Sequence, residues 1–170
     1  SLFMSTPVEI DKSYERLSPE KPILVVGHTY QPPREALLPA SRRRLGVAPG
    51  ENERIYRECY GPNFVENGET LPRGFLFSFY PGVRDWLRQA HPEKFQRIVE
   101  KVDALSNKAD QVLCDPYIHV ILPLLSKGDQ DMLIKIGKRA FEDDFGFQPK
   151  GLWLPETAVS NTTLEVVLDN

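Results

Sequence analysis

Cysteine is scarce in this sequence, and the two that are present form no recognisable site. Among 170 residues, Cys59 and Cys114 lie far apart, with no CxxC pair and no histidine at a spacing typical of zinc ligands. This pattern excludes a disulfide scaffold and a structural zinc site. It favours two buried thiols in a reducing compartment, so we expect a cytoplasmic protein without a metal or cofactor.

Long apolar runs and an excess of one charge are also missing. No apolar stretch approaches the roughly 18 residues of a membrane-spanning helix, and the first residues lack the basic and apolar regions of a secretory signal. The 21 Lys and Arg nearly balance the 24 Asp and Glu, for a net charge of −3. The compact basic run 41–44 fits a solvated loop. We therefore expect neither a membrane nor a nucleic-acid partner.

Proline is abundant instead, and it shapes the first half of the chain. Residues 1–20 are polar and unpatterned, which predicts an N-terminal arm before a folded part over 21–170. The apolar, β-branched run 22–27 predicts a strand buried on both faces. Most of the 15 prolines follow, and the Pro- and Gly-rich stretch 32–73 predicts a long functional loop with one short helical segment at 51–59.

Strand and helix signals alternate in the remainder. Apolar residues recur at helical spacing behind Pro92, and a second amphipathic pattern stops at Gly146. Thr162 and Glu165 have the spacing of a capping box. In chain order we predict strand 74–79, a helix from Pro92 to Leu105, strand 109–114, a short helix in 116–125, helix 129–145, strand 151–154 and helix 161–168. This order indicates an α/β fold in which helices cover a parallel sheet.

Chemically useful side chains follow three of the predicted strands. His28 comes directly after the first strand, Asp115 and His119 follow the third, and Glu156 follows the fourth. Functional residues of parallel α/β folds gather at the carboxyl ends of the strands, so we expect these groups to share a pocket. Because no strand follows the last predicted helix, we expect the four strands to form either a small open sheet or the opening half of a larger barrel.

Four segments of the sequence resemble glycoside hydrolase family 57, in the right order and spacing. They are GHTYQPPRE (27–35), NERIYRECYGPN (52–63), PYIHVILPLL (116–125) and GLWLPETAVS (151–160). The likeness is closest to a branch of the family known mainly from genome sequences. It implies that 21–170 is the N-terminal portion of a partial (β/α)7-type barrel, from an enzyme that cleaves or transfers α-glucosidic linkages with retention of configuration.

The resemblance also implies roles for individual residues. Glu156 matches the catalytic nucleophile of the family, and His28, Gln31 and Pro32 match its first substrate-contacting motif. His119 matches a second histidine motif, and we count Trp153 beside Glu156 among the substrate-binding residues. The implied partner is an oligo- or polysaccharide of the α-glucan type.

Several positions depart from the family pattern. Gln111 replaces a glutamate that often precedes the second histidine, and the run 77–81 differs from the usual Phe-Asn-Phe-Gly-Pro. The general acid/base aspartate of the family lies well downstream of the nucleophile, and Asp169 is badly placed for that role. A retaining glycosidase needs two carboxyl groups. We therefore expect the chain to be inactive alone and to form homo-oligomers through its exposed barrel edge.

Two other functions remain open at this point. A metal-dependent polysaccharide deacetylase would need a ligand set such as His28, Asp115 and His119. A non-catalytic carbohydrate-binding fragment would use Trp153, Tyr30 and Tyr117 as platforms for sugar rings.

Overall fold

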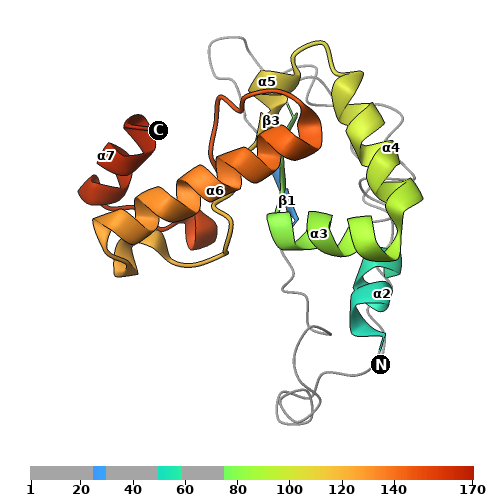
Figure 1. Cartoon of the computed structure of the whole chain (residues 1–170), viewed down its shortest axis with the longest axis horizontal. Coiled ribbons are helices and arrows are strands. Elements are labelled where there is room, and N and C mark those ends of the chain that lie inside the picture. The colour runs from blue at the N-terminus through green and yellow to red at the C-terminus, as the bar shows by residue number, and fades with distance from the viewer. Residues whose placement is uncertain (1–24, 30–49, 59–74) are drawn as a thin grey trace.

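The computed structural model describes residues 25–29, 50–58 and 75–170 (Figure 1). The predicted arm 1–20 and most of the predicted loop 32–73 lie outside the described residues. The elements, in chain order, are β1 (Val25–Thr29), α2 (Glu51–Ile55), β2 (Phe75–Phe79), α3 (Pro81–Ala90), α4 (Pro92–Asp103), α5 (Lys108–Gln111), β3 (Val112–Leu113), the 3₁₀ turn η4 (Leu122–Leu124), α6 (Lys127–Phe145), the 3₁₀ turn η5 (Pro155–Thr157) and α7 (Asn161–Leu168).

The strands form a parallel sheet in the order β1-β2-β3. A further parallel neighbour is reduced to one bridge, where the Cys114 N–H donates to the Gly151 carbonyl and the Trp153 N–H donates to the Cys114 carbonyl. The predicted α/β class with a parallel sheet is therefore confirmed. Strands that follow one another in the chain are neighbours in the sheet. Because they are parallel, their carboxyl ends lie at one edge.

The main hydrophobic core lies between the sheet and the helices α3, α4 and α6. Phe77 and Val112 from the strands are completely buried, and they meet Leu87 of α3, Val102 of α4 and Phe141 of α6. Aromatic side chains bury the largest apolar area per residue, so Phe77 and Phe141 are central to the stability of this core.

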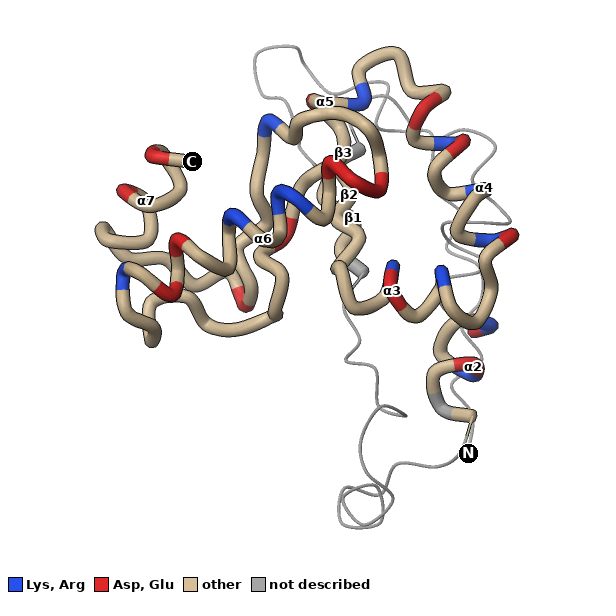
Figure 2. Tube along the Cα trace, in the orientation of Figure 1, with Lys and Arg blue, Asp and Glu red and all other residues tan. Residues whose placement is uncertain are grey.

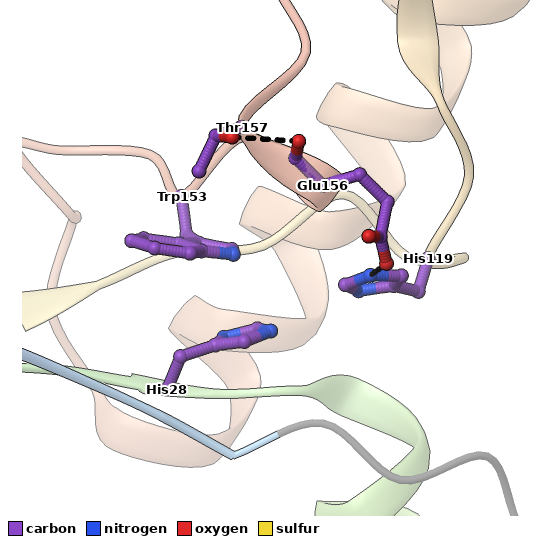
Figure 3. A pocket seen from close by; sticks show the side chains of 5 residues that line it. All are labelled: His28, His119, Trp153, Glu156 and Thr157. Carbon is purple, nitrogen blue, oxygen red and sulfur yellow. Dashed lines mark hydrogen bonds and ion pairs between the residues drawn. The ribbon is translucent and has the colours of Figure 1, made fainter.

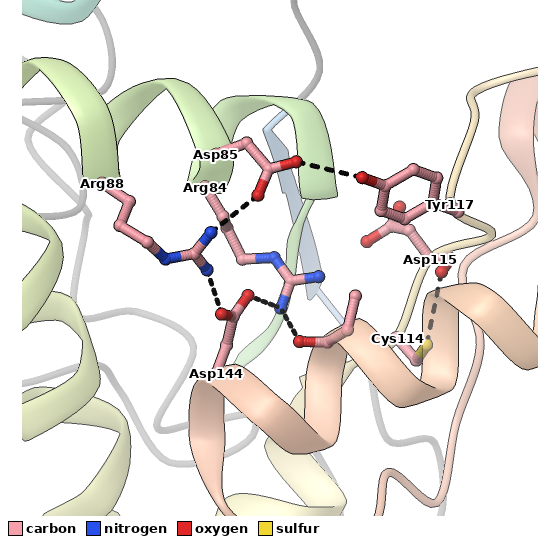
Figure 4. A network of polar contacts seen from close by, with 8 residues as sticks. Arg84, Asp85, Arg88, Cys114, Asp115, Tyr117 and Asp144 are labelled. Carbon is pink, nitrogen blue, oxygen red and sulfur yellow. Dashed lines mark hydrogen bonds and ion pairs between the residues drawn. The ribbon is translucent and has the colours of Figure 1, made fainter.

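A buried arginine ties α3 to α6 across this core (Figure 4). Arg84 is 1% exposed, and its Nη1 lies 2.8 Å from Asp144 Oδ2. Its guanidinium carbon also lies 5.3 Å from the centre of the Phe145 ring, and Arg88 pairs with the other oxygen of Asp144. Loss of one partner would leave a buried charge uncompensated, so this ion pair is costly to break.

The C-terminal part of the chain has a smaller core of its own. Leu122 of η4, Ile134 of α6 and Val166 of α7 are buried together, and α7 packs at the end of α6 that is distant from the sheet (Figure 1). Basic and acidic residues are interspersed along α4 and α6 (Figure 2), with i,i+4 ion pairs on α6 such as Lys135–Asp131. None of the helices described here has the length and apolar character needed to cross a membrane.

A glycine in α6 permits a close approach between two segments of the fold. A Cβ added at Gly137 would lie 2.1 Å from the Asp115 carbonyl oxygen and 2.9 Å from the Tyr117 nitrogen. The segment after β3 therefore lies directly on the backbone of α6, and the Tyr117 N–H donates to the Leu133 carbonyl over 3.0 Å. This contact fixes the strand end that carries Asp115.

Two predicted elements are only partly correct. The predicted strand 109–114 is a helical turn, α5, followed by two strand residues, because Asp110 and Gln111 both donate their N–H groups to the Asn107 carbonyl. The predicted helix in 116–125 is reduced to η4. Its first half lies along α6, where the bond from Tyr117 to Leu133 replaces a helical one.

Other predictions need smaller corrections. β1 reaches Thr29, α2 ends at Ile55 before a wider turn, and α6 begins at Lys127 because Ser126 accepts from the Asp129 N–H. The helix 161–168 is confirmed, but its cap is Ser160, which accepts from the Thr163 N–H over 3.1 Å. Helix α3 went unpredicted, although Pro81 at its first position is a typical start signal.

Candidate active site

Four sequence-predicted site residues line one open pocket of about 340 Å³ at the carboxyl edge of the sheet (Figure 3). His28 comes from β1, His119 from the segment after β3, and Trp153 and Glu156 from the segment after the bridge at Leu152. Thr157 completes the lining. The parallel order of the strands explains why residues from distant parts of the sequence meet here.

Glu156 is the exposed acid of this pocket, and a buried histidine holds it. Glu156 Oε1 lies 3.0 Å from His119 Nε2, and the side chains of Glu156 and His119 are 60% and 5% exposed. The His119 ring also meets the edge of Tyr80, and its backbone N–H donates weakly to the Tyr80 hydroxyl over 3.4 Å. The carboxylate therefore has one oriented oxygen while it faces the open side of the pocket.

The backbone at Glu156 adopts an unusual conformation. Glu156 and Thr157 both have φ of 54°, which is the left-handed region. They are the non-glycine residues with positive φ in the described part of the chain, and such residues are strained and concentrate at functional sites. The Thr157 hydroxyl donates to the Glu156 carbonyl over 2.7 Å, and this bond secures the turn that presents the carboxylate.

Three rings form a stacked wall beside Glu156. The His28 ring centre lies 4.7 Å from that of Trp153 and 5.5 Å from that of His119, with interplanar angles of 24° and 25°. Trp153 Nε1 is buried and has no hydrogen-bond partner among the described residues. An indole N–H that is unsatisfied at a pocket wall is suited to donate to a ligand oxygen.

His28 is neutral near physiological pH. Burial, with the neighbouring His119 acting in the same direction, lowers its pKa to about 4, although Glu156 acts in the opposite direction. A neutral imidazole offers one hydrogen-bond donor and one acceptor, so its tautomer decides which group meets a ligand.

A polar pair lies behind His28 in the sheet. The Ser78 hydroxyl is 3.1 Å from His28 Nδ1 and donates to Asp115 Oδ2 over 2.5 Å. Asp115 Oδ1 is 3.9 Å from the same His28 nitrogen. Burial raises the pKa of Asp115 to about 7, although the bond from Ser78 and the charge of Arg84 lower it. Register explains the contact, because His28 and Ser78 pair directly between β1 and β2.

The remaining sequence candidates have different positions. Gln31, Pro32 and Tyr30 lie outside the described residues. Tyr117 does not line the pocket, and its hydroxyl lies 3.4 Å from Asp85 on α3. In the described part of the chain, no group of three or more His, Cys, Asp or Glu side chains is arranged to hold a metal ion. The ligand set offered for a deacetylase is therefore not assembled here.

The sequence reasoning missed two features of the site. Thr157 lines the pocket although no motif singled it out, and its place next to Glu156 was the only available signal. Ser78 attracted attention only as a departure from the family pattern at 77–81. Its link to Asp115, which is 37 residues away in the chain, depends on the sheet register and is invisible locally.

Comparisons with known proteins agree with the fold described above. The crystal structure of 4-alpha-glucanotransferase from Thermococcus litoralis matches 86% of this chain and 21% of that chain, with a TM-score of 0.63 and 15% sequence identity. This likeness confirms the predicted partial-barrel α/β fold. Alpha-amylase 1 from Dictyoglomus thermophilum is 32% identical over 106 residues, which are 61% of this chain and 15% of that protein.

The chain thus spans a small part of the length of both relatives. The model of glycosyl hydrolase family 57 matches residues 12–170, which is most of the sequence. The chain therefore belongs to glycosyl hydrolase family 57.

Proposed function

We propose that this pocket is one part of the active site of a retaining glycoside hydrolase or glucanotransferase that acts on α-glucans. The observation that carries the proposal is the exposed carboxylate of Glu156, oriented by buried His119 at the carboxyl edge of a parallel sheet. Family membership supports the reaction class. The names of the two relatives, an amylase and a glucanotransferase, support an α-glucan as the substrate.

Glu156 serves as the nucleophile in this proposal. A Glu156 oxygen attacks the anomeric carbon, and the glycosidic bond breaks with its electron pair moving to the leaving oxygen. His119 holds the Oε1 oxygen of the Glu156 carboxylate in place. His28 and Trp153 form the wall against which the sugar binds. Gln31 is proposed to contact the substrate as well, from outside the described residues.

The leaving oxygen must receive a proton from a second carboxyl group, about 5–5.5 Å from the first in retaining enzymes. Among the described residues that line the pocket, Glu156 is the sole carboxylate. Asp115 is 2% exposed and lies behind His28, so a sugar cannot reach it. We propose that the chain alone is therefore inactive on ordinary glucans, since general-acid catalysis contributes roughly 10²–10⁴-fold.

A glucan donor with fluoride at the anomeric carbon tests the nucleophile directly. Fluoride leaves without protonation, so the chain should form a covalent ester between the sugar and Glu156 even without a second acid. Mass spectrometry of the digested chain should find the adduct on the peptide that contains Glu156. The adduct should vanish in Glu156→Gln and persist in Glu165→Gln, a matched change of an exposed carboxylate on α7.

Labelling of any other residue, or an adduct that survives in Glu156→Gln, would show that the nucleophile is wrongly assigned. A second candidate, non-catalytic carbohydrate binding, is favoured by the stacked Trp153 and its unpartnered Nε1 within the described residues. In that case maltooligosaccharides would bind equally to the wild type and to Glu156→Gln, and the fluoride would leave no adduct.

The proposal also covers the cellular compartment and the oligomeric state of the chain. Buried Cys114 is a free thiol, which suits a reducing compartment such as the cytoplasm. Large apolar side chains are exposed in the C-terminal part, notably Leu124, Met132 and Leu168. Exposed apolar surface of this kind promotes association, so we propose that the isolated chain forms homo-oligomers.

A further inference from the structure

We propose that Ser78 and Asp115 are positioning residues that keep the proton of His28 on Nδ1, so that Nε2 of this pocket histidine is a hydrogen-bond acceptor. The inference rests on the proposed function only for the identity of the ligand, which would be a sugar hydroxyl that donates to Nε2. The state of the His28 ring follows from contacts within the chain itself.

The first step is a count of hydrogens. A serine hydroxyl has one hydrogen to donate and two lone pairs to accept with. Ser78 donates its hydrogen to Asp115 Oδ2 over 2.5 Å, because an ionised carboxylate can only accept. The contact of 3.1 Å between Ser78 Oγ and His28 Nδ1 can then be a hydrogen bond only if Nδ1 carries a proton.

The local field favours the same arrangement. Asp115 Oδ1 lies 3.9 Å from His28 Nδ1 and has no hydrogen-bond partner among the described residues. A buried negative charge at this distance favours the positive end of an N–H bond over a lone pair. Arg84, 1% exposed on α3, is the nearby cation that favours the ionised form of Asp115.

The ring contacts with Trp153 and His119 help to hold His28 in place. Trp153 and His119 both stack against His28, and these contacts oppose a turn of the ring that would exchange its nitrogens. His28 is neutral above about pH 5, since its pKa is lowered to about 4. A neutral ring with its proton on Nδ1 has a lone pair on Nε2, and any partner of Nε2 must donate.

For ligand recognition, this tautomer would place a hydrogen-bond donor and a hydrogen-bond acceptor side by side on the pocket wall. Trp153 Nε1 is a donor only, and His28 Nε2 becomes an acceptor only. Two neighbouring groups of opposite kind suit a pair of hydroxyls, each of which can donate and accept. A site built to hydrogen-bond a hydroxyl discriminates strongly against ligands without that group, so a deoxy sugar lacking the donating hydroxyl should bind less tightly.

Nuclear magnetic resonance can determine the tautomer in the ligand-free chain. The sequence has only three histidines, at 28, 91 and 119, so long-range correlations between ring nitrogens and ring protons can be assigned with single His→Gln variants. At pH 8, where Asp115 is ionised, His28 should show a protonated Nδ1 and a bare Nε2. The preference should be on the order of ten-fold, the value of one buried hydrogen bond.

Ser78→Ala removes the bridging acceptor and should reduce this preference severalfold, with only the charge of Asp115 left to favour Nδ1, while the signals of His91 stay unchanged. Asp85→Asn is the matched control, because it alters an exposed carboxylate that contacts Tyr117 and Arg88 rather than Ser78. It should leave His28 as in the wild type.

A wild-type chain with the proton on Nε2 at pH 8 would overturn the inference, and so would an unchanged tautomer in folded Ser78→Ala. If Ser78→Ala does not fold, the wild-type spectrum alone decides. Since no ligand is present, the result is independent of the labelling of Glu156. A failure of the proposed function and a failure of this inference are therefore distinguishable.

Discussion

Replacing Asp115 with asparagine should change how the stability of the chain depends on pH. Asp115 is 2% exposed, and burial raises its pKa to about 7 in the folded state, whereas an unfolded aspartate has a pKa near 3.9. Between these values the folded state binds a proton that the unfolded state does not. The free energy of unfolding of the wild type therefore falls as the pH rises through this range.

The size of the effect follows from the distance between the pKa values. From pH 5 to about pH 7, Asp115 keeps its proton in the folded state, whereas the unfolded state is already ionised. Stability therefore falls over about two pH units within the range from pH 5 to pH 8. At about 1.4 kcal/mol per pH unit, the wild type loses up to about 3 kcal/mol from this group. An asparagine side chain does not titrate, so the Asp115→Asn variant escapes this loss.

His28 has the opposite pH dependence and must be separated from Asp115. Its folded pKa is lowered to about 4, below the unfolded value near 6.5. Its contribution therefore raises stability as the pH increases through that interval, and it partly hides the effect of Asp115 in the wild type alone. Both proteins contain His28, so most of its contribution cancels in the difference between the variant and the wild type, which then reports mainly on Asp115.

Urea unfolding of both proteins at pH 5 and pH 8 measures this difference. Relative to the wild type, Asp115→Asn should be more stable at pH 8 than at pH 5 by about 2–3 kcal/mol. Asp85→Asn is the control and should show the same difference at both pH values to within about 0.5 kcal/mol. A relative stability of Asp115→Asn that is constant, or that falls at pH 8, would refute the account of the buried carboxyl group.

Three further predictions follow from the fold and the proposed assembly. Gly137→Ala should destabilise the chain by about 1–3 kcal/mol or more in urea unfolding, because its Cβ would lie 2.1 Å from the Asp115 carbonyl; Gly128→Ala, in the first turn of the same helix, where a Cβ would meet Ser126 Oγ at an ordinary 3.9 Å, should be neutral or stabilising by up to about 1 kcal/mol. Ser160→Ala should cost about 1 kcal/mol through loss of the α7 cap, and an equal loss in Thr162→Ala would contradict this cap. Light scattering at tens of micromolar should find oligomers of the wild type, with fewer after Leu124→Lys and Leu168→Lys; a monomer throughout would count against association.

Sequence patterns predicted the fold class because its elements leave strong local signals. The continuous apolar runs that contain β1 and β2 allow little besides a buried strand, and the pattern behind Pro92 matches α4 closely. Segment 109–114 was only partly correct because a local helical turn to Asn107 takes its first residues, and segment 116–125 because its conformation depends on distant partners. The bond from Tyr117 to Leu133 and the approach to Gly137 are tertiary contacts that no local pattern records.

The same distinction applies to the candidate site. His28, His119, Trp153 and Glu156 were predictable as a group, because parallel strands end at one edge and the family motifs mark these positions. Ser78 was not, since a serine inside a strand is ordinary until the register places it beside His28. The cap of α7 shows a local ambiguity, in which Ser160 and Thr162 both precede suitable partners and the tertiary start of the helix selects Ser160.

The turn at Glu156 combines two demands that an ordinary turn would not meet. A nucleophilic carboxylate has to be exposed to the substrate and yet point in a single direction. Two consecutive residues in the left-handed region turn the chain sharply after Pro155, at a cost of about 1–2 kcal/mol each. His119, 5% exposed, holds the carboxylate from one side, and the Thr157 hydroxyl secures the Glu156 carbonyl. Glycine at position 157 would reduce the strain but would also lose this bond and increase the freedom of the chain. The cost of the strained turn is therefore consistent with a requirement for an exposed carboxylate that is fixed in direction before a substrate binds.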